Sequence, residues 1–121
     1  MFSDCDKIIE IDFSFFNTTQ VNNMSNMFNG CTGLTSLNFT NFDTSNVIDM
    51  GSMFYKCSNL SSIDLYNFNT SNINNMTNMF SNCSSLVSLN LSNFETKNVI
   101  KFDKTVFVIN RIKYKIFLAK F

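Results

Sequence analysis

The sequence contains no histidine, no tryptophan and no proline, and it has only three glycines. Without histidine, the chain has no imidazole to act as a base near neutral pH or as a metal ligand. The segment Met1 to Lys7 is acidic and has no apolar h-region, so it does not resemble a secretory signal. The longest uncharged stretch of the apolar tail, Thr105 to Asn110, is far shorter than the ~20 residues of a membrane span. We therefore predict no transmembrane segment and no export signal in this chain.

Charge is balanced in total and uneven along the chain. Nine basic and nine acidic residues cancel, so no overall field draws the molecule to nucleic acid or to an anionic membrane. Basic residues gather from Lys97 onward, while residues 1–96 hold most of the acids. A single basic run without a basic body is typical of a solvated cap, so we predict no nucleic-acid partner.

The four cysteines reveal an internal repeat, because Cys5, Cys31, Cys57 and Cys83 are spaced by 26 residues. Alignment at this period places like residues in columns. The apolar columns include Ile8, Leu34, Leu60, Leu86; Ile11, Leu37, Ile63, Leu89; Phe13, Phe39, Leu65, Leu91; Phe16, Phe42, Phe68, Phe94; and Met24, Met50, Met76. So many columns in one register predict a repeated structural unit.

Each unit has two kinds of periodicity. Leu37 to Phe39 alternates apolar and polar residues, as a strand with one buried face does. Apolar residues between Val47 and Cys57 recur every three or four positions, which indicates a helical or 3₁₀ segment, and Asp43 to Asn46 suits the turn before it. Neither half buries its apolar side alone. We predict an α/β solenoid, a leucine-rich-repeat-like, right-handed stack of about four 26-residue units of strand, turn and short helix.

The predicted solenoid covers residues 1–100, with units at 5–30, 31–56 and 57–82 and a partial unit at 83–100. Residues 101–121 form a divergent basic segment, in which Arg111, Lys113 and Lys115 alternate with apolar residues as in a capping edge strand. Met1 to Cys5 matches the middle of a unit, so we interpret the chain as a fragment of a longer array. About four units is near the minimum of ~3 for a repeat array, and we expect marginal stability and end-to-end self-association.

The unit M-x-x-M-F-x-x-C-x-x-L-x-x-L-x-L-x-x-F-x-T-x-N-V resembles the repeat of the BspA-like leucine-rich-repeat surface proteins, especially the variant found in mollicute lipoproteins. The resemblance covers residues 1 to about 100. It implies a right-handed solenoid, a cell-surface or secreted parent protein, and a role in adhesion to other proteins. Two features depart from the family: the chain lacks an export signal, and the fourth unit loses the pattern after Val99.

Several columns admit a chemical and a structural interpretation. Zinc sites use closely spaced cysteine pairs, which do not occur here, so we interpret the cysteines as buried free thiols that fill space. We interpret the methionines as core packing and the asparagine columns as ladders that bond backbone groups from unit to unit. The threonine column, Thr18, Thr44, Thr70 and Thr96, admits an ice-binding row as the least favoured alternative.

The best candidate site is the exposed face of the predicted strands, which is polar and mildly acidic. It consists of Glu10, Asp12, Ser14; Ser36, Asn38, Thr40; Ser62, Asp64, Tyr66; and Ser88, Asn90, Ser92. We predict that Asp12, Asn38, Thr40, Asp64, Tyr66 and Asn90 bind the partner. The face has no nucleophile–base pair, so we predict a non-enzymatic module without a cofactor that binds proteins or glycans. The alternative is a spacer or a decayed repeat without a ligand.

Overall fold

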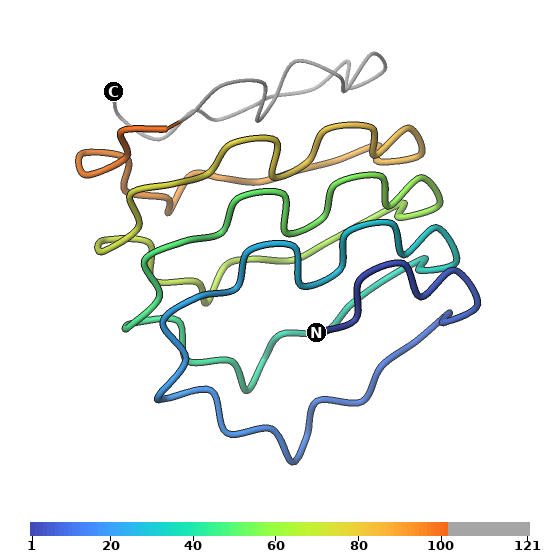
Figure 1. Cartoon of the computed structure of the whole chain (residues 1–121), viewed down its shortest axis with the longest axis horizontal. Coiled ribbons are helices and arrows are strands. Elements are labelled where there is room, and N and C mark those ends of the chain that lie inside the picture. Colours follow the sequence, from blue (N-terminus) through green and yellow to red (C-terminus); the bar gives the residue numbers. More distant parts are fainter. Residues whose placement is uncertain (102–121) are drawn as a thin grey trace.

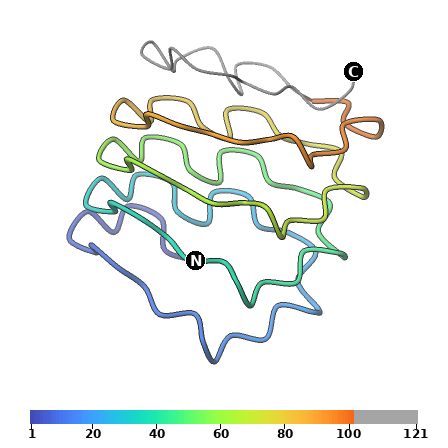
Figure 2. The same ribbon diagram turned by 180° about the vertical axis from the view of Figure 1, so that it is seen from behind.

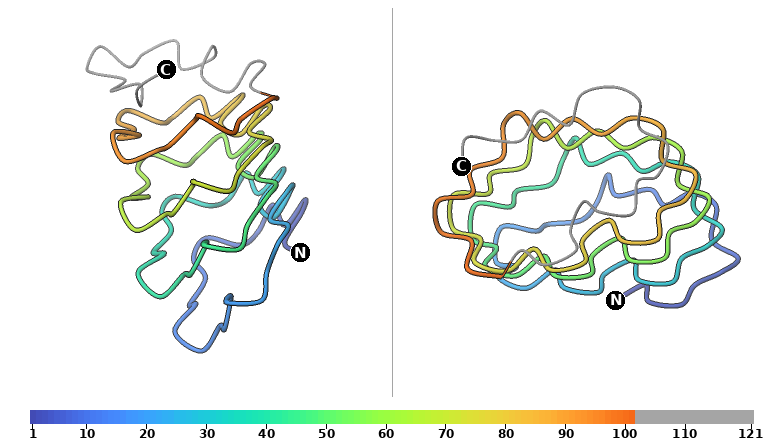
Figure 3. Two further views of the ribbon diagram at one scale, coloured as in Figure 1. Left: turned by 90° about the vertical axis from the view of Figure 1, so that its left-hand side faces the viewer. Right: turned by 90° about the horizontal axis from the view of Figure 1, so that it is seen from above.

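Residues 1–101 are described in the computed structural model, and they wind into successive coils that lie one above another (Figure 1). The same order is seen from behind (Figure 2). Viewed along the stack, the coils overlie one another around a common interior (Figure 3). The predicted capping strand, with Arg111, Lys113 and Lys115, lies outside the described residues.

The described part of the chain contains no helix and no strand longer than an isolated bridge, so the expectation of a strand and a short helix in each unit was wrong. At the end of the second repeat, the Met53 N–H donates to the Met50 carbonyl at 3.2 Å, and the N–H of Cys57, the first residue of the third repeat, donates to the Phe54 carbonyl at 3.1 Å. These bonds close two separate four-residue turns, Met50 to Met53 and Phe54 to Cys57. The Phe54 N–H, which lies between them, donates to the Met79 carbonyl of the next coil at 2.9 Å. It therefore cannot donate to a carbonyl four residues earlier, as an α-helix requires.

Backbone pairing between repeats is concentrated in the segment before each cysteine. Isolated parallel bridges join Asn23 to Asp49, Asp49 to Asn75, and Asn75 to Lys101. Alternate N–H groups of the second repeat donate to carbonyls of the third at 2.8–3.0 Å: Met50 to Asn75, Ser52 to Thr77, Phe54 to Met79, and Lys56 to Ser81. This segment holds neighbouring coils together through the backbone.

Residues with positive φ recur in this segment, whose alternate N–H groups all donate to the next repeat. Ser52 and Lys56 have positive φ angles of 57° and 61°, and the equivalent residues of the other repeats share this conformation. Side chains other than glycine, asparagine and aspartate rarely adopt it, because the Cβ crowds the backbone. The bonds to the next repeat therefore hold these two residues in a strained conformation.

The predicted strand at Leu37 to Phe39 has the expected burial and lacks the expected pairing. Leu37 and Phe39 are buried while Asn38 is exposed, as the alternation predicts. In this segment and its equivalents in the other repeats, few backbone hydrogen bonds join neighbouring coils. The Ser61 N–H donates to the Thr35 carbonyl at 3.1 Å, the Val87 N–H donates to the Ser61 carbonyl at 3.2 Å, and a single bridge joins Ser62 to Ser88. Figure 3 shows that the coils converge on one side and spread apart on the other.

The core consists of columns of identical or similar apolar side chains with a regular spacing of 26 residues. The rings of Phe2, Phe28, Phe54 and Phe80 stack with centroids 5.7, 5.6 and 5.4 Å apart and within 9° of parallel. Leu34, Leu60 and Leu86 are buried, as are the methionines Met50, Met53 and Met76. Apolar side chains of neighbouring repeats thus exclude water together, and the methionines are core residues, as predicted.

Three of the four threonines of the column are internal, which contradicts the exposed row that the ice-binding alternative needs. Thr18, Thr44 and Thr70 are buried. The Thr44 hydroxyl donates to the Asn69 carbonyl at 3.0 Å and accepts the Asn69 N–H at 2.8 Å. Thr18 bonds Asp43 and Thr70 bonds Glu95 in the same way. Each hydroxyl therefore satisfies both polar backbone groups of a residue in the next repeat.

One of the predicted asparagine ladders is present. The Asn72 side-chain amide donates to the Ser45 carbonyl at 2.7 Å, Asn46 does so to Thr19, and Asn98 to Ser71. In the other column, Asn93 donates to the Tyr66 carbonyl at 3.4 Å. These amides supply partners for backbone carbonyls at the bends.

The cysteines are free thiols, and three of the four are buried. The Cys57 thiol donates to the Phe28 carbonyl at 3.1 Å, and Cys83 to Phe54 at 3.0 Å. Burial raises the pKa of the Cys83 thiol to about 12 and raises that of Cys57 as well. The column therefore fills space, as predicted, and each of these two thiols also satisfies a carbonyl of the neighbouring coil, 29 residues earlier in the chain.

Candidate functional site

The candidate site is the polar face, the set of twelve exposed residues defined above by positions 10, 12 and 14 and their equivalents in the next three repeats. All twelve side chains are exposed. The segments that carry them spread apart because few backbone bonds join neighbouring coils here. The face therefore has gaps between coils that a hydrogen-bonded sheet surface would not have.

Asp12, Asn38, Asp64 and Asn90, here called the Asx column, each close a local turn. Their Oδ1 atoms accept the backbone N–H two residues on: Ser14 at 2.8 Å, Thr40 at 2.9 Å, Tyr66 at 2.9 Å and Ser92 at 3.0 Å. The hydroxyls of Ser14 and Thr40 also donate to these oxygens. Such Asx turns fix the rotamer of the side chain. The four side chains are thus held in place before any partner arrives.

The second terminal atom of each Asx-column side chain remains available. Within residues 1–101, the Oδ2 atoms of Asp12 and Asp64 and the Nδ2 atoms of Asn38 and Asn90 make no hydrogen bond. A carboxylate oxygen only accepts, and an amide nitrogen only donates. Along the stack, the column therefore offers an acceptor, a donor, an acceptor and a donor.

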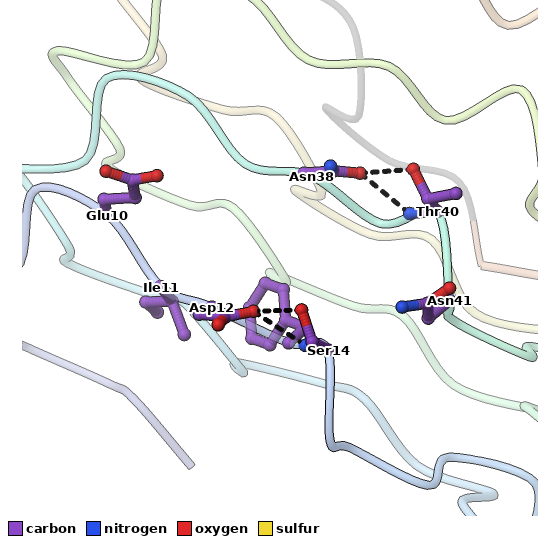
Figure 4. A pocket seen from close by; sticks show the side chains of 8 residues that line it. Glu10, Ile11, Asp12, Ser14, Asn38, Thr40 and Asn41 are labelled. Atoms are coloured by element: carbon purple, nitrogen blue, oxygen red, sulfur yellow. Dashed lines mark hydrogen bonds between the residues drawn. The ribbon is translucent and has the colours of Figure 1, made fainter.

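Two hollows open between neighbouring coils of this face. The first, of about 230 Å³, lies between the first and second repeats and includes Glu10, Asp12, Ser14, Asn38 and Thr40 (Figure 4). In this view, Asp12 with Ser14 and Asn38 with Thr40 form its two polar sides.

The second hollow, of about 250 Å³, is the first one moved by one repeat. It is lined by Asn38, Thr40, Asp64, Tyr66 and Asn67, with Leu37 and Phe39 beneath them. Positions 12, 14, 38, 40 and 41 of the first hollow become 38, 40, 64, 66 and 67 here. The repeat therefore generates a row of like sites.

Both hollows are acidic, and exposed aromatic side chains lie in the second hollow and beside the first. No lysine or arginine lines either hollow. Hydrogen bonds from the Ser14 hydroxyl and N–H hold the pKa of the Asp12 carboxyl below its ordinary value. Tyr66 lines the second hollow and is 69% exposed, and Phe15, next to Ser14, is 95% exposed. Single exposed apolar side chains are common on protein surfaces, so these two rings suit a contact with a partner and do not by themselves mark one.

The structure brings together five of the six predicted binding residues: Asp12, Asn38, Thr40, Asp64 and Tyr66 line the two hollows. Asn90 is exposed on the same face and lines neither of them. Asn41 and Asn67 also line the hollows, although they belong to the column of Asn93, which the sequence predicts to be a structural ladder. The signal that could have found the turns is the spacing of aspartate or asparagine with serine or threonine two residues later, as in Asn38 and Thr40.

Two further observations bear on the kind of site. In residues 1–101, no three histidine, cysteine, aspartate or glutamate side chains lie close enough to share a metal ion. Among the same residues, no helix has the length and apolar character needed to cross a membrane.

Together these features define a repeat protein in which a 26-residue unit builds both the core and a row of polar hollows. The family model described as "Mycoplasma protein of unknown function, DUF285" matches residues 1–117, and the chain belongs to that family. Comparison with curated proteins gives no match. Comparison with solved structures gives none either.

Proposed function

We propose that this chain is a non-enzymatic binding module of a cell-surface or secreted adhesin, which holds proteins or glycans on its polar face. The observation that carries the proposal is the repetition of one hollow by a step of a single repeat. A row of like, shallow sites suits a long partner that makes several weak contacts at once, because linked contacts raise the effective concentration of each other.

The finer architecture belongs to the same proposal: a right-handed, leucine-rich-repeat-like solenoid. It is supported by the parallel bridges between residues 26 apart and by the stacked phenylalanine rings. The resemblance of the repeat to BspA-like surface proteins supports the location and the adhesive role. The absence of histidine from the sequence supports a role without acid–base catalysis at neutral pH.

End-to-end association is part of the proposed behaviour, with a second copy of the chain as the partner. Phe16 and Val21 of the first repeat are half-buried, whereas the equivalent Phe42 and Val47 are buried beneath the preceding coil. The half-buried pair lines an apolar hollow of about 260 Å³ together with Met1. Light scattering over a range of concentrations should show growth in mass, and a constant monomer mass would contradict this association.

The binding proposal is tested with the full chain immobilised and exposed to panels of host-surface proteins and of glycans. The double variant Asp64→Ala, Tyr66→Ala should lose most of the binding, because both side chains line the second hollow. The matched control is Asp43→Ala, since Asp43 accepts the Ser45 N–H at 2.9 Å in an Asx turn outside the polar face.

Equal binding by the double variant and the unchanged chain would refute the polar face as the site. No binding by the unchanged chain on either panel would favour the alternative function, that of a spacer without its own ligand.

A further inference from the structure

We infer that the polar face takes an uncharged, linear, β-linked glycan that lies along the stack, with successive sugars in successive hollows. This inference rests on the proposed binding function and names its ligand class. It follows from four properties of the described residues: the alternation of donors and acceptors, the step between repeats, the exposed ring of Tyr66, and the charge of the face.

The alternation of the Asx column matches sugar hydroxyls. Asp12 and Asp64 present acceptors, and Asn38 and Asn90 present donors, each fixed by its Asx turn. A hydroxyl donates one hydrogen bond and accepts others, so a chain of sugars can meet both kinds of atom in turn. Because the side chains are already ordered, less conformational entropy is lost when they bind.

The step between repeats matches one sugar unit. Phe13 lines the first hollow and Phe39, one repeat on, lines the second; the centroids of these two buried rings are 5.6 Å apart. One pyranose ring of an extended β-linked chain spans a similar length. An extended peptide advances only about 3.4 Å per residue, so its donors and acceptors would drift out of register with the column.

Tyr66 supplies an apolar surface for the C–H face of a sugar ring. It lines the second hollow and most of its side chain is exposed. A tyrosine ring combines an apolar face with a polar tip and loses little conformational freedom on binding. The position of Tyr66 beside Asp64 and Asn67 places this surface next to hydrogen-bonding groups.

Charge narrows the class of glycan. Glu10, Asp12 and Asp64 line the hollows, and no lysine or arginine does. A sulfated or carboxylated glycan would meet like charges at every second repeat and would be repelled. Uncharged glycans, such as β-1,4-linked glucose or N-acetylglucosamine oligomers, avoid this repulsion and offer hydroxyls at each step.

The test is isothermal titration of the full chain with β-1,4-linked glucose oligomers and β-1,4-linked N-acetylglucosamine oligomers of one to four units. We expect affinity for at least one series to rise at least tenfold from the monosaccharide to the trisaccharide. A heparin-derived sulfated oligosaccharide should bind at least tenfold more weakly. Affinity that is independent of length in both series, or tighter binding of the sulfated oligosaccharide, would overturn the inference.

Two isosteric variants test the alternation directly, because aspartate and asparagine form the same turn in this column. Asp64→Asn changes an acceptor into a donor, and Asn38→Asp makes the reverse change. Each should weaken trisaccharide binding at least fivefold, while Asp43→Asn, outside the face, should leave it unchanged. Circular dichroism reports whether each variant folds, and Asp64→Asn, which removes a charge, keeps the test valid if Asn38→Asp does not fold.

The aromatic contact is tested by Tyr66→Ala, which should weaken trisaccharide binding about tenfold, while Tyr66→Phe retains it. Wild-type affinity for all polar-face variants would refute the inference. If the variants lose binding to a protein partner while the chain binds neither glycan series, the glycan inference fails and the proposed function stands. If the variants change no binding at all, both fail.

Discussion

Replacing Thr44 with valine should destabilise the protein by about 2–3 kcal/mol, although valine has the same shape and is more apolar. The buried Thr44 hydroxyl donates to the Asn69 carbonyl and accepts the Asn69 N–H. Each hydrogen bond contributes roughly 1 kcal/mol, and an unpaired, partly buried backbone group costs more because it has lost water as well. The valine methyl cannot replace either bond, so the free energy of unfolding falls.

Urea denaturation followed by circular dichroism measures this loss as a shift in midpoint at constant slope. Thr44→Ser keeps the hydroxyl and loses one methyl group, which costs about 0.8 kcal/mol. Thr19→Val removes an exposed hydroxyl that bonds only Asn17 and should change stability by no more than about 0.5 kcal/mol. A valine variant as stable as the serine variant would refute the role assigned to the threonine column.

Three further predictions address other columns. Ser52→Gly should stabilise the protein by about 0.5–1 kcal/mol in the same assay, since Ser52 has a φ of 57°, whereas Ser52→Ala should give no gain. Near pH 8 and without denaturant, a thiol reagent should modify Cys5 first and Cys57 slowly, because burial raises the pKa of Cys57; equal rates would contradict the buried column. Asn69→Asp adds a carboxylate between acids of the neighbouring repeats, among them Asp43, and should destabilise by about 0.5–1 kcal/mol at pH 7. Repulsion raises the pKa of the added group, so this loss should disappear as pH falls below about 4, and a loss that persists there would exclude repulsion as its cause.

The core was predictable because the 26-residue period assigns the same environment to every member of a column. Leu34, Phe54 and Met50 are buried as the alignment indicates. The secondary structure was not predictable from the same pattern. Apolar residues at three- and four-residue steps indicate a helix, but Ser52 and Lys56 adopt positive φ and send alternate N–H groups to the next repeat. Neither residue type favours that conformation, but the equivalent residues of the other repeats do: Asn26 and Asn78 correspond to Ser52, and Asp4, Gly30 and Asn82 to Lys56. The signal therefore lies in the columns and not in the second repeat itself.

The candidate site was predictable as a set of exposed residues and not as a set of hollows. Alternation around Leu37 and Phe39 correctly indicates that Asn38 and Thr40 are exposed. The hollows exist because backbone pairing runs through another segment, which lets these coils spread apart. That arrangement depends on which segment forms the inter-repeat bonds, and a periodic pattern of burial is compatible with either choice.

Acidic and amide side chains alternate along the stack in a way that connects stability with the candidate site. Asp and Asn provide the same oxygen for a local turn, so the turn alone does not choose between them. Charge favours one over the other, because two carboxylates at equivalent positions of neighbouring repeats would repel each other. The bridged segment shows the benefit: the Asn75 amide donates to both carboxylate oxygens of Asp49, at 3.0 and 3.1 Å. On the polar face, Asp12, Asn38 and Asp64 follow the same alternation without contacting one another's free atoms. The alternation of aspartate with asparagine that avoids repulsion between neighbouring repeats therefore also produces a row of alternating acceptors and donors on the polar face. The Asp64→Asn and Asn38→Asp variants would disrupt this row.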